Sequence, residues 1–290
     1  MALDRILLAE VVDYAGLFPP AALSMEQAVA EYARERTGPD AWALGRFVVP
    51  APRLSDFANA LGAGHQGDPW PTAVTAASRE EAIQITGAMS RQDGTAARFD
   101  AAELRAGAVP EAKELLAIVP RSLVRFVEIP VGGEQGPLLS VLRSNGAGAK
   151  FRTGGVTPDA FPSPEALLDS LASCIQAQLP FKCTAGLHHP VRGVYPLTYA
   201  EDSLTSTMFG YLNVMFAAAG LLAGWTRAEA LAALLDEDRG AFTLTADRLA
   251  WRGRVLTEAT IRGLRQTGLQ GFGSCSFREP MSELAALGAA

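Results

Sequence analysis

Two of the three lysines in this sequence occupy matching positions in two similar motifs. The first motif is Ala149-Lys150-Phe151-Arg152-Thr153-Gly154-Gly155, and the second is Phe181-Lys182-Cys183-Thr184-Ala185-Gly186. Lysine and arginine together number 25, and the third lysine is Lys113, so arginine is the usual cation of this chain. Arginine cannot give up its proton at neutral pH, whereas a desolvated lysine can act as a nucleophile or a base. The repeated lysine therefore predicts amine chemistry, such as formation of an imine with a carbonyl compound.

The environment of the two lysines decides between two interpretations. If their strands are neighbours, like-charge repulsion lowers the lysine pKa and makes a neutral amine available near pH 7. In the alternative, Lys150 and Lys182 pair with carboxylates or hold an anion without reacting.

Other polar side chains follow the predicted strands, where catalytic groups of a parallel barrel gather. The strand ends also carry Asp100, Glu103, Ser276 and Glu279. As catalytic candidates we take Lys182, Lys150, Glu128 and His188. As substrate-binding candidates we take Arg152, Thr153, Gly154, Gly155, Thr184, His189, Ser274 and Arg278. Arg152 and Arg278 are the expected clamp for an anion, and the glycine-rich turns offer backbone N–H groups to it.

His188 and His189 are adjacent, directly after the second lysine motif. Either could act as a general acid or base, or could bind a divalent metal together with a carboxylate such as Glu128. No HxH or HxxxH spacing supports a metal centre, so the main prediction includes neither a metal nor another cofactor.

Short apolar runs alternate with helical patterns from residue 44 onward. The predicted strands are 46–50, 72–76, 97–100 and 123–129, followed by the two lysine motifs as the fifth and sixth strands. Alternation of this kind favours a parallel sheet covered by helices. The alternative to a barrel is an open doubly wound sheet, but no GxGxxG motif for a dinucleotide follows a strand. The sequence therefore predicts an α/β fold, a (β/α)₈ barrel of the TIM type.

The two ends of the pattern are less regular than its middle. Residues 1–40 predict an N-terminal helical extension that packs on a single barrel domain spanning 1–290. Within it, residues 13–21 contain Gly16 and two prolines, which exclude regular structure. This segment is interpreted as an apolar plug, a subunit contact or a lid. The seventh strand is uncertain: it is either Phe242–Thr245, in a hairpin with 248–252, or the region is an insertion.

The lysine motifs resemble the two lysine strands of deoxyribose-phosphate aldolase and related class I aldolases. In that family one strand lysine forms an imine and a lysine on the neighbouring strand lowers its pKa. The resemblance covers residues 123–190 and includes Arg125-Phe126-Val127-Glu128, which is similar to a family strand ending in Glu. Aligned on Arg152-Thr153-Gly154-Gly155, the family's Lys-Thr-Ser-Thr-Gly pattern places an arginine at the imine position and Lys182 at that of the helper.

Composition excludes several classes of function. The chain has 290 residues, 49% of them hydrophobic, and a net charge of −6 without a basic cluster, so neither nucleic acid nor a membrane is an expected partner. Three cysteines without CxxC spacing and the absence of a leader-like N-terminus suit the cytoplasm. The apolar run at 208–222 and the segment 13–21 are candidates for contacts in a homo-oligomer.

These patterns predict a lyase of class I aldolase type that acts on a small anionic oxo or sugar-like metabolite. Lys182 or Lys150 is the expected imine nucleophile, and Glu128 or His188 the acid or base. Two alternatives stay open. One is a metal-dependent lyase or isomerase that uses His188 or His189 with Glu128, and the other is a non-catalytic protein for anion binding or assembly.

Overall fold

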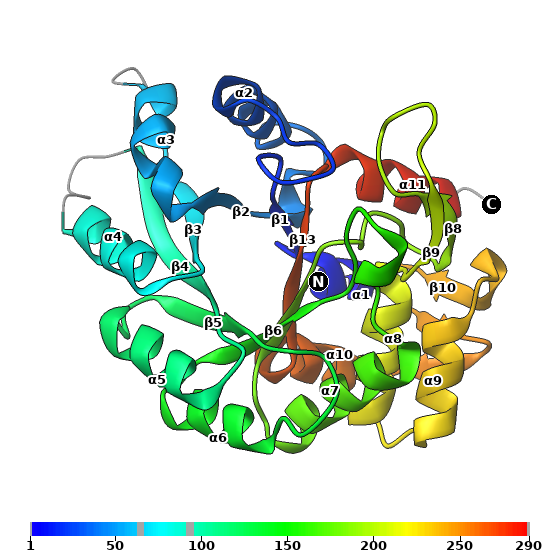
Figure 1. The fold of residues 1–290 in the computed structure, drawn as a ribbon. Helices are drawn as coiled ribbons and strands as arrows, with labels where there is room; N and C mark the ends of the chain where they lie inside the picture. The colour runs from blue at the N-terminus through cyan, green and yellow to red at the C-terminus, as the bar shows by residue number, and fades with distance from the viewer. Residues whose placement is uncertain (1, 63–66, 91–95, 289–290) are drawn as a thin grey trace.

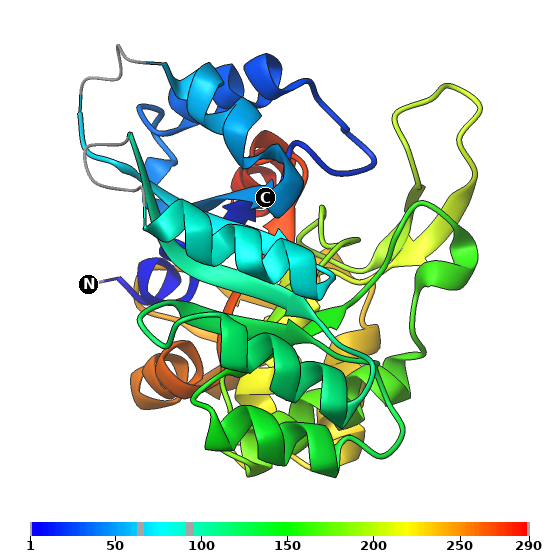
Figure 2. The ribbon, with the colours of Figure 1, turned by 60° about the vertical axis from the view of Figure 1, so that its left-hand side comes forward.

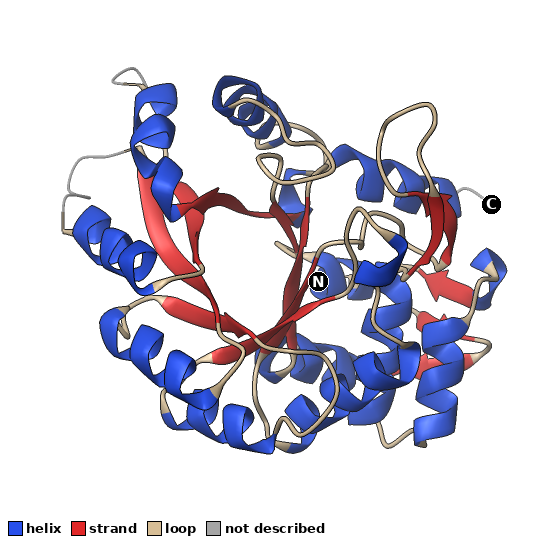
Figure 3. Ribbon diagram, viewed as in Figure 1, coloured by secondary structure: helices blue, strands red, loops and turns tan. Residues whose placement is uncertain are grey.

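The chain folds into a closed barrel of eight parallel strands inside a ring of helices, as the computed structural model in Figures 1 and 3 shows. The structure describes residues 2–62, 67–90 and 96–288. The order around the barrel is β1-β13-β7-β6-β5-β4-β3-β2, and neighbouring strands pair in parallel. The predicted (β/α)₈ barrel is confirmed.

The barrel wall consists of β1 (Val12–Tyr14), β2 (Leu44–Pro50), β3 (Trp70–Ala76), β4 (Ala97–Arg105), β5 (Val124–Glu128), β6 (Gly148–Arg152), β7 (Phe181–Thr184) and β13 (Leu269–Ser274). Apolar side chains of these strands face the helices in one large core, in which aromatic pairs such as Phe47 and Phe57 are stacked at 4.7 Å.

The helices that follow barrel strands directly are α2 (Met25–Glu35), α3 (Leu54–Leu61), α4 (Arg79–Met89), α5 (Val109–Ile118), α6 (Gly136–Ser144), α7 (Pro164–Gln176) and α11 (Arg278–Gly288). Side-chain caps fix where several of them begin. Ser24 and Gln27 form a capping box at the start of α2, and Ser163 caps α7. None of the described helices has the length and apolar character needed to cross a membrane.

The structure corrects the predicted N-terminal extension. Residues 1–40 contain a short helix, α1 (Leu3–Leu8), and then the first strand and helix of the barrel itself, β1 and α2. β1 pairs with β2 on one side and with β13 on the other, so it closes the barrel. A strand of three residues that runs into Gly16 and Pro19 has no room for an alternating pattern, which is why the sequence does not reveal it.

The chain leaves the barrel after β7 and returns at β13. Between them lie the hairpin of β8 (Gly193–Pro196) and β9 (Thr205–Met208), the helices α8 (Tyr211–Leu222), α9 (Arg227–Leu235) and α10 (Glu258–Thr267), and an antiparallel sheet of β10 (Phe242–Leu244), β11 (Leu249–Trp251) and β12 (Arg254–Leu256). The predicted hairpin at 241–252 is confirmed as β10 and β11, and it supplies no barrel strand.

The segment between β7 and β13 also supplies the helix that completes the ring. Helix α8 packs against both α7 and α10, and so fills the place of the helix that would follow β7. The β8–β9 hairpin is antiparallel and projects beyond the ring in Figure 2.

The two lysine strands are the sixth and seventh of the barrel, one place later than predicted, because β1 precedes them. Lys150 of β6 lies opposite Lys182 of β7, and Glu128 of β5 lies opposite Lys150. Successive side chains of a strand point to opposite faces. Phe151 accordingly joins the apolar core, whereas Lys150 and Arg152 line a cavity.

Candidate active site

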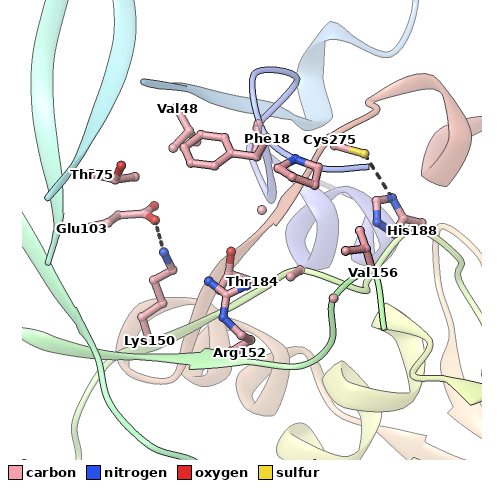
Figure 4. Close-up of a pocket in the computed structure, with 15 residues that line it drawn as sticks. Phe18, Val48, Thr75, Glu103, Lys150, Arg152, Val156, Thr184, His188 and Cys275 are labelled. Carbon is pink, nitrogen blue, oxygen red and sulfur yellow. Dashed lines mark hydrogen bonds and ion pairs between the residues drawn. The ribbon is translucent and has the colours of Figure 1, made fainter. Parts of the chain in front are cut away.

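A cavity of about 300 Å³ opens at the carboxyl ends of the barrel strands. Figure 4 shows Lys150 and Glu103 on one side of this cavity and His188 with Cys275 on another, with Phe18 near Val48. Active sites of this fold lie at the same end of the barrel. It brings together groups from strands that are far apart in the sequence.

Lys182 lies at the centre of the barrel and is almost completely buried. Its Nζ is 2.5 Å from Asp13 Oδ2 and 2.5 Å from Glu103 Oε1. The other oxygen of Asp13 accepts a hydrogen bond of 2.6 Å from the backbone N–H of Arg46. Two carboxylates thus hold the buried ammonium group, which compensates for its loss of water.

Lys150 shares Glu103 with Lys182 but reaches the cavity. Its Nζ is 2.7 Å from Glu103 Oε2 and 3.1 Å from Glu128 Oε2. The remaining oxygen of Glu128, Oε1, accepts a hydrogen bond of 3.0 Å from Arg152 Nε. A continuous chain of alternating charges therefore runs from Lys182 to Arg152 through two shared carboxylates.

The pKa directions of three members of this chain favour their charged forms. Burial disfavours charge on Glu103, but the two lysines outweigh burial and hold the pKa of Glu103 well below its usual range. The pKa of Glu128 is likewise lowered, against its burial, by Lys150 and Arg152. For Lys182, the attraction of Asp13 and Glu103 exceeds the effect of burial and raises the pKa. The prediction that like charge lowers a lysine pKa is wrong for Lys182, because Glu103 separates the two ammonium groups.

His188 lines the cavity at a distance from the lysines. Its Nδ1 lies 3.4 Å from Glu279 Oε2, 3.4 Å from Ser274 Oγ and 3.8 Å from Cys275 Sγ. Burial favours the neutral ring, but hydrogen bonds and charge from Cys275 and Glu279 outweigh it and raise the pKa of His188 to about 10. His188 is therefore positively charged at neutral pH and can donate a proton.

His189 turns away from the lysines into a second cavity of about 260 Å³, which His188, Gly155 and Tyr199 also line. Its ring stacks on Tyr195 with centroids 3.5 Å apart, and its Nδ1 is 2.7 Å from Glu283 Oε1. The two cavities share His188 and Gly155, so they adjoin.

The carboxylates that approach the histidines are not the one predicted. Ligand atoms of His189, Glu279 and Glu283 lie within 4.8 Å of one another, whereas Glu128 is paired with Lys150 and Arg152. Glu279 faces the charged ring of His188, and Glu283 is 3.7 Å from Arg239 Nη2. The charges of this group are thus compensated by the protein's own cations.

Several predicted substrate-binding residues have a structural position instead. The hydroxyl of Thr153 is buried and donates to the carbonyl oxygens of Thr184 and Ala185. Gly154 is in close contact with Gly186, since a Cβ on Gly154 would lie 3.0 Å from Gly186 Cα. These contacts join the ends of β6 and β7. Gly155 and Thr184 do line the cavity, as predicted.

Arg278 does not reach the cavity. Its guanidinium group is bound to both oxygens of Glu35 on α2, at 2.8 and 2.9 Å, and its side chain is 60% exposed. The predicted anion clamp of Arg152 and Arg278 is therefore wrong in its second member. Arg278 begins α11 and its side chain joins that helix to α2.

The segment between β1 and α2 borders the cavity, since Ala15, Phe18 and Pro19 contribute to the lining. The segment is tied down by hydrogen bonds from Ala15 N to Ser274 O and from Leu23 N to Gly16 O. This position agrees with the predicted plug or lid, and the subunit contact stays a prediction.

Two site residues are missing from the sequence-based candidates, Asp13 and Cys275. Asp13 lies between Val12 and Tyr14, and an acid inside an apolar run was a usable signal because buried carboxylates require partners. Cys275 was not among the candidates, yet it lines the cavity beside His188. Glu103 was recognised as lying at a strand end, but not as the carboxylate that joins both lysines.

Comparison of the chain with models of protein families, with curated proteins and with solved structures finds no match. The geometry of the site is therefore the basis for a functional proposal.

Proposed function

We propose that the protein is a lyase that breaks or forms a carbon–carbon bond next to a carbonyl group, with an imine on Lys150. The amine attacks the carbonyl carbon, and water leaves as the imine forms. The protonated imine accepts the electron pair of the bond between the α and β carbons, while the β-hydroxyl group loses its proton and becomes a carbonyl. The resulting enamine takes up a proton, and water then releases the product and the amine.

The position of Lys150 is the observation that carries this proposal. Among the residues described, Lys150 is the one lysine in the lining of the cavity, whereas Lys182 lies beneath it between Asp13 and Glu103. A covalent nucleophile must be accessible to a carbonyl carbon, so Lys150 is a better nucleophile than Lys182. The sequence alone left this choice open.

The neighbours of Lys150 suit the proton transfers of an imine mechanism. Glu103 and Glu128 are both within 3.1 Å of its Nζ, where either can accept a proton from the ammonium group. Lys182 shares Glu103 with Lys150 and so weakens the hold of that carboxylate on the Lys150 ammonium group. His188, charged at neutral pH, faces the same cavity and can donate a proton to a substrate oxygen.

The spacing of the first motif supports the same assignment. Placed on Lys150 instead of Arg152, the aldolase pattern Lys-Thr-Ser-Thr-Gly matches Lys150, Thr153 and Gly154 without a gap. Lys182, on the neighbouring strand and in register with Lys150, then takes the place of the helper lysine. We treat this resemblance as support for the proposal and assign each role from the residues of this chain.

Borohydride trapping tests the proposal, because borohydride reduces an imine to a stable secondary amine. The intact protein is incubated with small aldehydes, ketones and 2-oxo acids, reduced, weighed by mass spectrometry and mapped by peptide analysis. We expect one adduct, on Lys150, in the wild type and none at that position in Lys150→Arg. Lys113→Arg is the matched control, since Lys113 is exposed and should affect neither the adduct nor its position.

A non-catalytic anion-binding protein gives a different result in the same experiment. Simple charge pairing with a ligand tolerates Lys150→Arg, whereas an imine requires the amine. Ligand-induced thermal stabilisation that survives Lys150→Arg, without any adduct in the folded wild type, would contradict the lyase proposal and favour anion binding.

A further inference from the structure

Arg152 has an open edge, which here means the terminal guanidinium nitrogens that the protein leaves free toward the cavity. Its Nε is bound to Glu128, its side chain is 49% exposed, and it belongs to the cavity lining. Within the described part of the chain, its terminal guanidinium nitrogens have no hydrogen-bond partner. A guanidinium group whose Nε is already fixed still offers its terminal N–H groups, in a rigid arrangement that suits a carboxylate.

The open edge lies next to the amine. Lys150 and Arg152 are two residues apart on β6, so their side chains point to the same side of the strand. Glu128 fixes both of them with its two oxygens, at 3.1 Å from Lys150 Nζ and 3.0 Å from Arg152 Nε. Figure 4 shows the two side chains extending into the cavity side by side. The anion that Arg152 can hold is therefore close to the carbon that Lys150 attacks.

The charges around the cavity indicate how much negative charge a ligand can bring. Asp13, Glu103 and Glu128 are matched by Lys150, Lys182 and Arg152 in the chain of ion pairs. Charged His188 is matched by Glu279. The charges of these ion pairs thus balance before a substrate binds, and the terminal N–H groups of Arg152 stay free to hold an anion. This suits one carboxylate better than a phosphate, which carries nearly two negative charges.

From these observations, and resting on the proposed imine chemistry, we infer that the substrate is a 2-oxo acid whose carboxylate binds the open edge of Arg152. In a 2-oxo acid the carboxylate is attached directly to the carbonyl carbon. The imine carbon can then bond to Lys150 while the carboxylate lies against the neighbouring guanidinium group. A phosphorylated sugar places its anion several bonds from the carbonyl, so the anion lies farther from the carbon that Lys150 attacks.

The wild-type protein tests the inference by competition between carbonyl compounds. Pyruvate and 2-oxobutanoate are compared with hydroxyacetone, propanal and glyceraldehyde 3-phosphate in borohydride trapping, and the concentration that gives half-maximal adduct on Lys150 is measured for each. We expect the 2-oxo acids to label at a concentration at least about tenfold lower than the others, as one charged hydrogen-bonded contact provides.

Arg152→Gln gives the second measurement, with Arg227→Gln as its control. Arg227 is 53% exposed, and its ion pair with Asp169 is remote from the cavity lining. We expect the preference for pyruvate over hydroxyacetone to fall at least about tenfold in Arg152→Gln and to be unchanged in Arg227→Gln. The comparison among wild-type ligands decides the question even if Arg152→Gln fails to fold.

The possible failures are distinguishable. Labelling of Lys150 by aldehydes or by the phosphorylated sugar in preference to 2-oxo acids would overturn the assignment of a 2-oxo acid as substrate but not the imine mechanism. A pyruvate preference that Arg152→Gln retains would also overturn it, because the carboxylate would be bound elsewhere. Absence of any adduct on Lys150 with the whole panel would overturn both proposals.

Discussion

Glu103 is the residue on which the two lysines depend. Each of its oxygens contacts a different ammonium group, and the carboxylate is almost fully buried. Removal of one partner from a buried ion pair costs far more than the pair itself contributes, since the remaining charge stays desolvated. At the scale of the residue, stability and chemistry at this site are therefore connected through one carboxylate.

Glu103→Gln is expected to lower the free energy of unfolding by about 3–5 kcal/mol, because Lys150 and Lys182 lose a shared negative charge in the barrel interior. Urea denaturation measures this change. Glu114→Gln is the matched control: its ion pair with Arg79 is 2.6 Å long but about half exposed, with side-chain exposures of 48% and 59%. The control should change stability by less than about 1 kcal/mol. Equal small effects of both substitutions would contradict the assigned role of Glu103.

The raised pKa of His188 predicts how its contribution to stability depends on pH. A pKa that is higher in the folded than in the unfolded protein means that the charged ring stabilises the fold. This contribution is complete below the unfolded pKa of about 6.5 and is lost as pH rises through the folded pKa of about 10.

Urea denaturation of wild type and His188→Gln at several pH values tests this expectation. The stability difference between them should be constant below about pH 6.5 and should shrink, in favour of the variant, as the pH approaches 10. A difference that stays constant between these values and changes below about pH 6.5 instead would show that the folded state holds the neutral ring.

At the scale of the element, β1 connects the closure of the barrel with the site. Its Asp13 binds Lys182, and its backbone pairs with β2 and β13. Gly45 of β2 allows this close approach, because a Cβ at that position would lie 2.4 Å from Asp13 Oδ1 and 3.2 Å from Val12 O. Since backbone atoms cannot move aside easily, the contact requires glycine.

Gly45→Ala is accordingly expected to reduce stability by about 1–3 kcal/mol and to displace Asp13 from Lys182. Thermal or urea denaturation measures the first effect, and loss of imine trapping on Lys150 reports the second. Gly136→Ala is the control, since Gly136 begins α6 with no atom within 4 Å of an added Cβ. The control should be neutral or slightly stabilising. A Gly45→Ala protein as stable as wild type would show that β1 can shift without cost.

At the scale of the whole molecule, the regular alternation of strands and helices was predictable, but the short first strand and the insertion after β7 were not. The strands from 46 to 184 were found because each is an apolar run followed by a helical pattern. β1 was missed because it has three residues and ends near Gly16, whereas the run at 271–280, expected to be the closing strand, overlaps β13 (Leu269–Ser274). Short strands and insertions are defined by long-range pairing, which no local pattern records.

The site was predictable in its types of residue but not in its pairings. The two lysines, Glu128, Arg152 and His188 all belong to the cavity or to its charge network. Glycine and threonine at 153–154 were overestimated, because the same residues also serve to join strand ends. Asp13 was missed because its pairing with Lys182 depends on the position of β1 in the barrel. Arg278 was misassigned because its partner, Glu35, lies more than a hundred residues away from the lysine motifs.

The position of a reduced adduct tests the central claim most directly. The wild-type protein is incubated with pyruvate and borohydride, and peptide mapping locates the added mass. The account predicts an adduct on Lys150, at the cavity wall, with Lys182 and Lys113 unmodified. An adduct on Lys182, or its persistence in Lys150→Arg, would contradict the assignment of the nucleophile. A folded protein that forms no adduct with any carbonyl compound would contradict imine chemistry altogether.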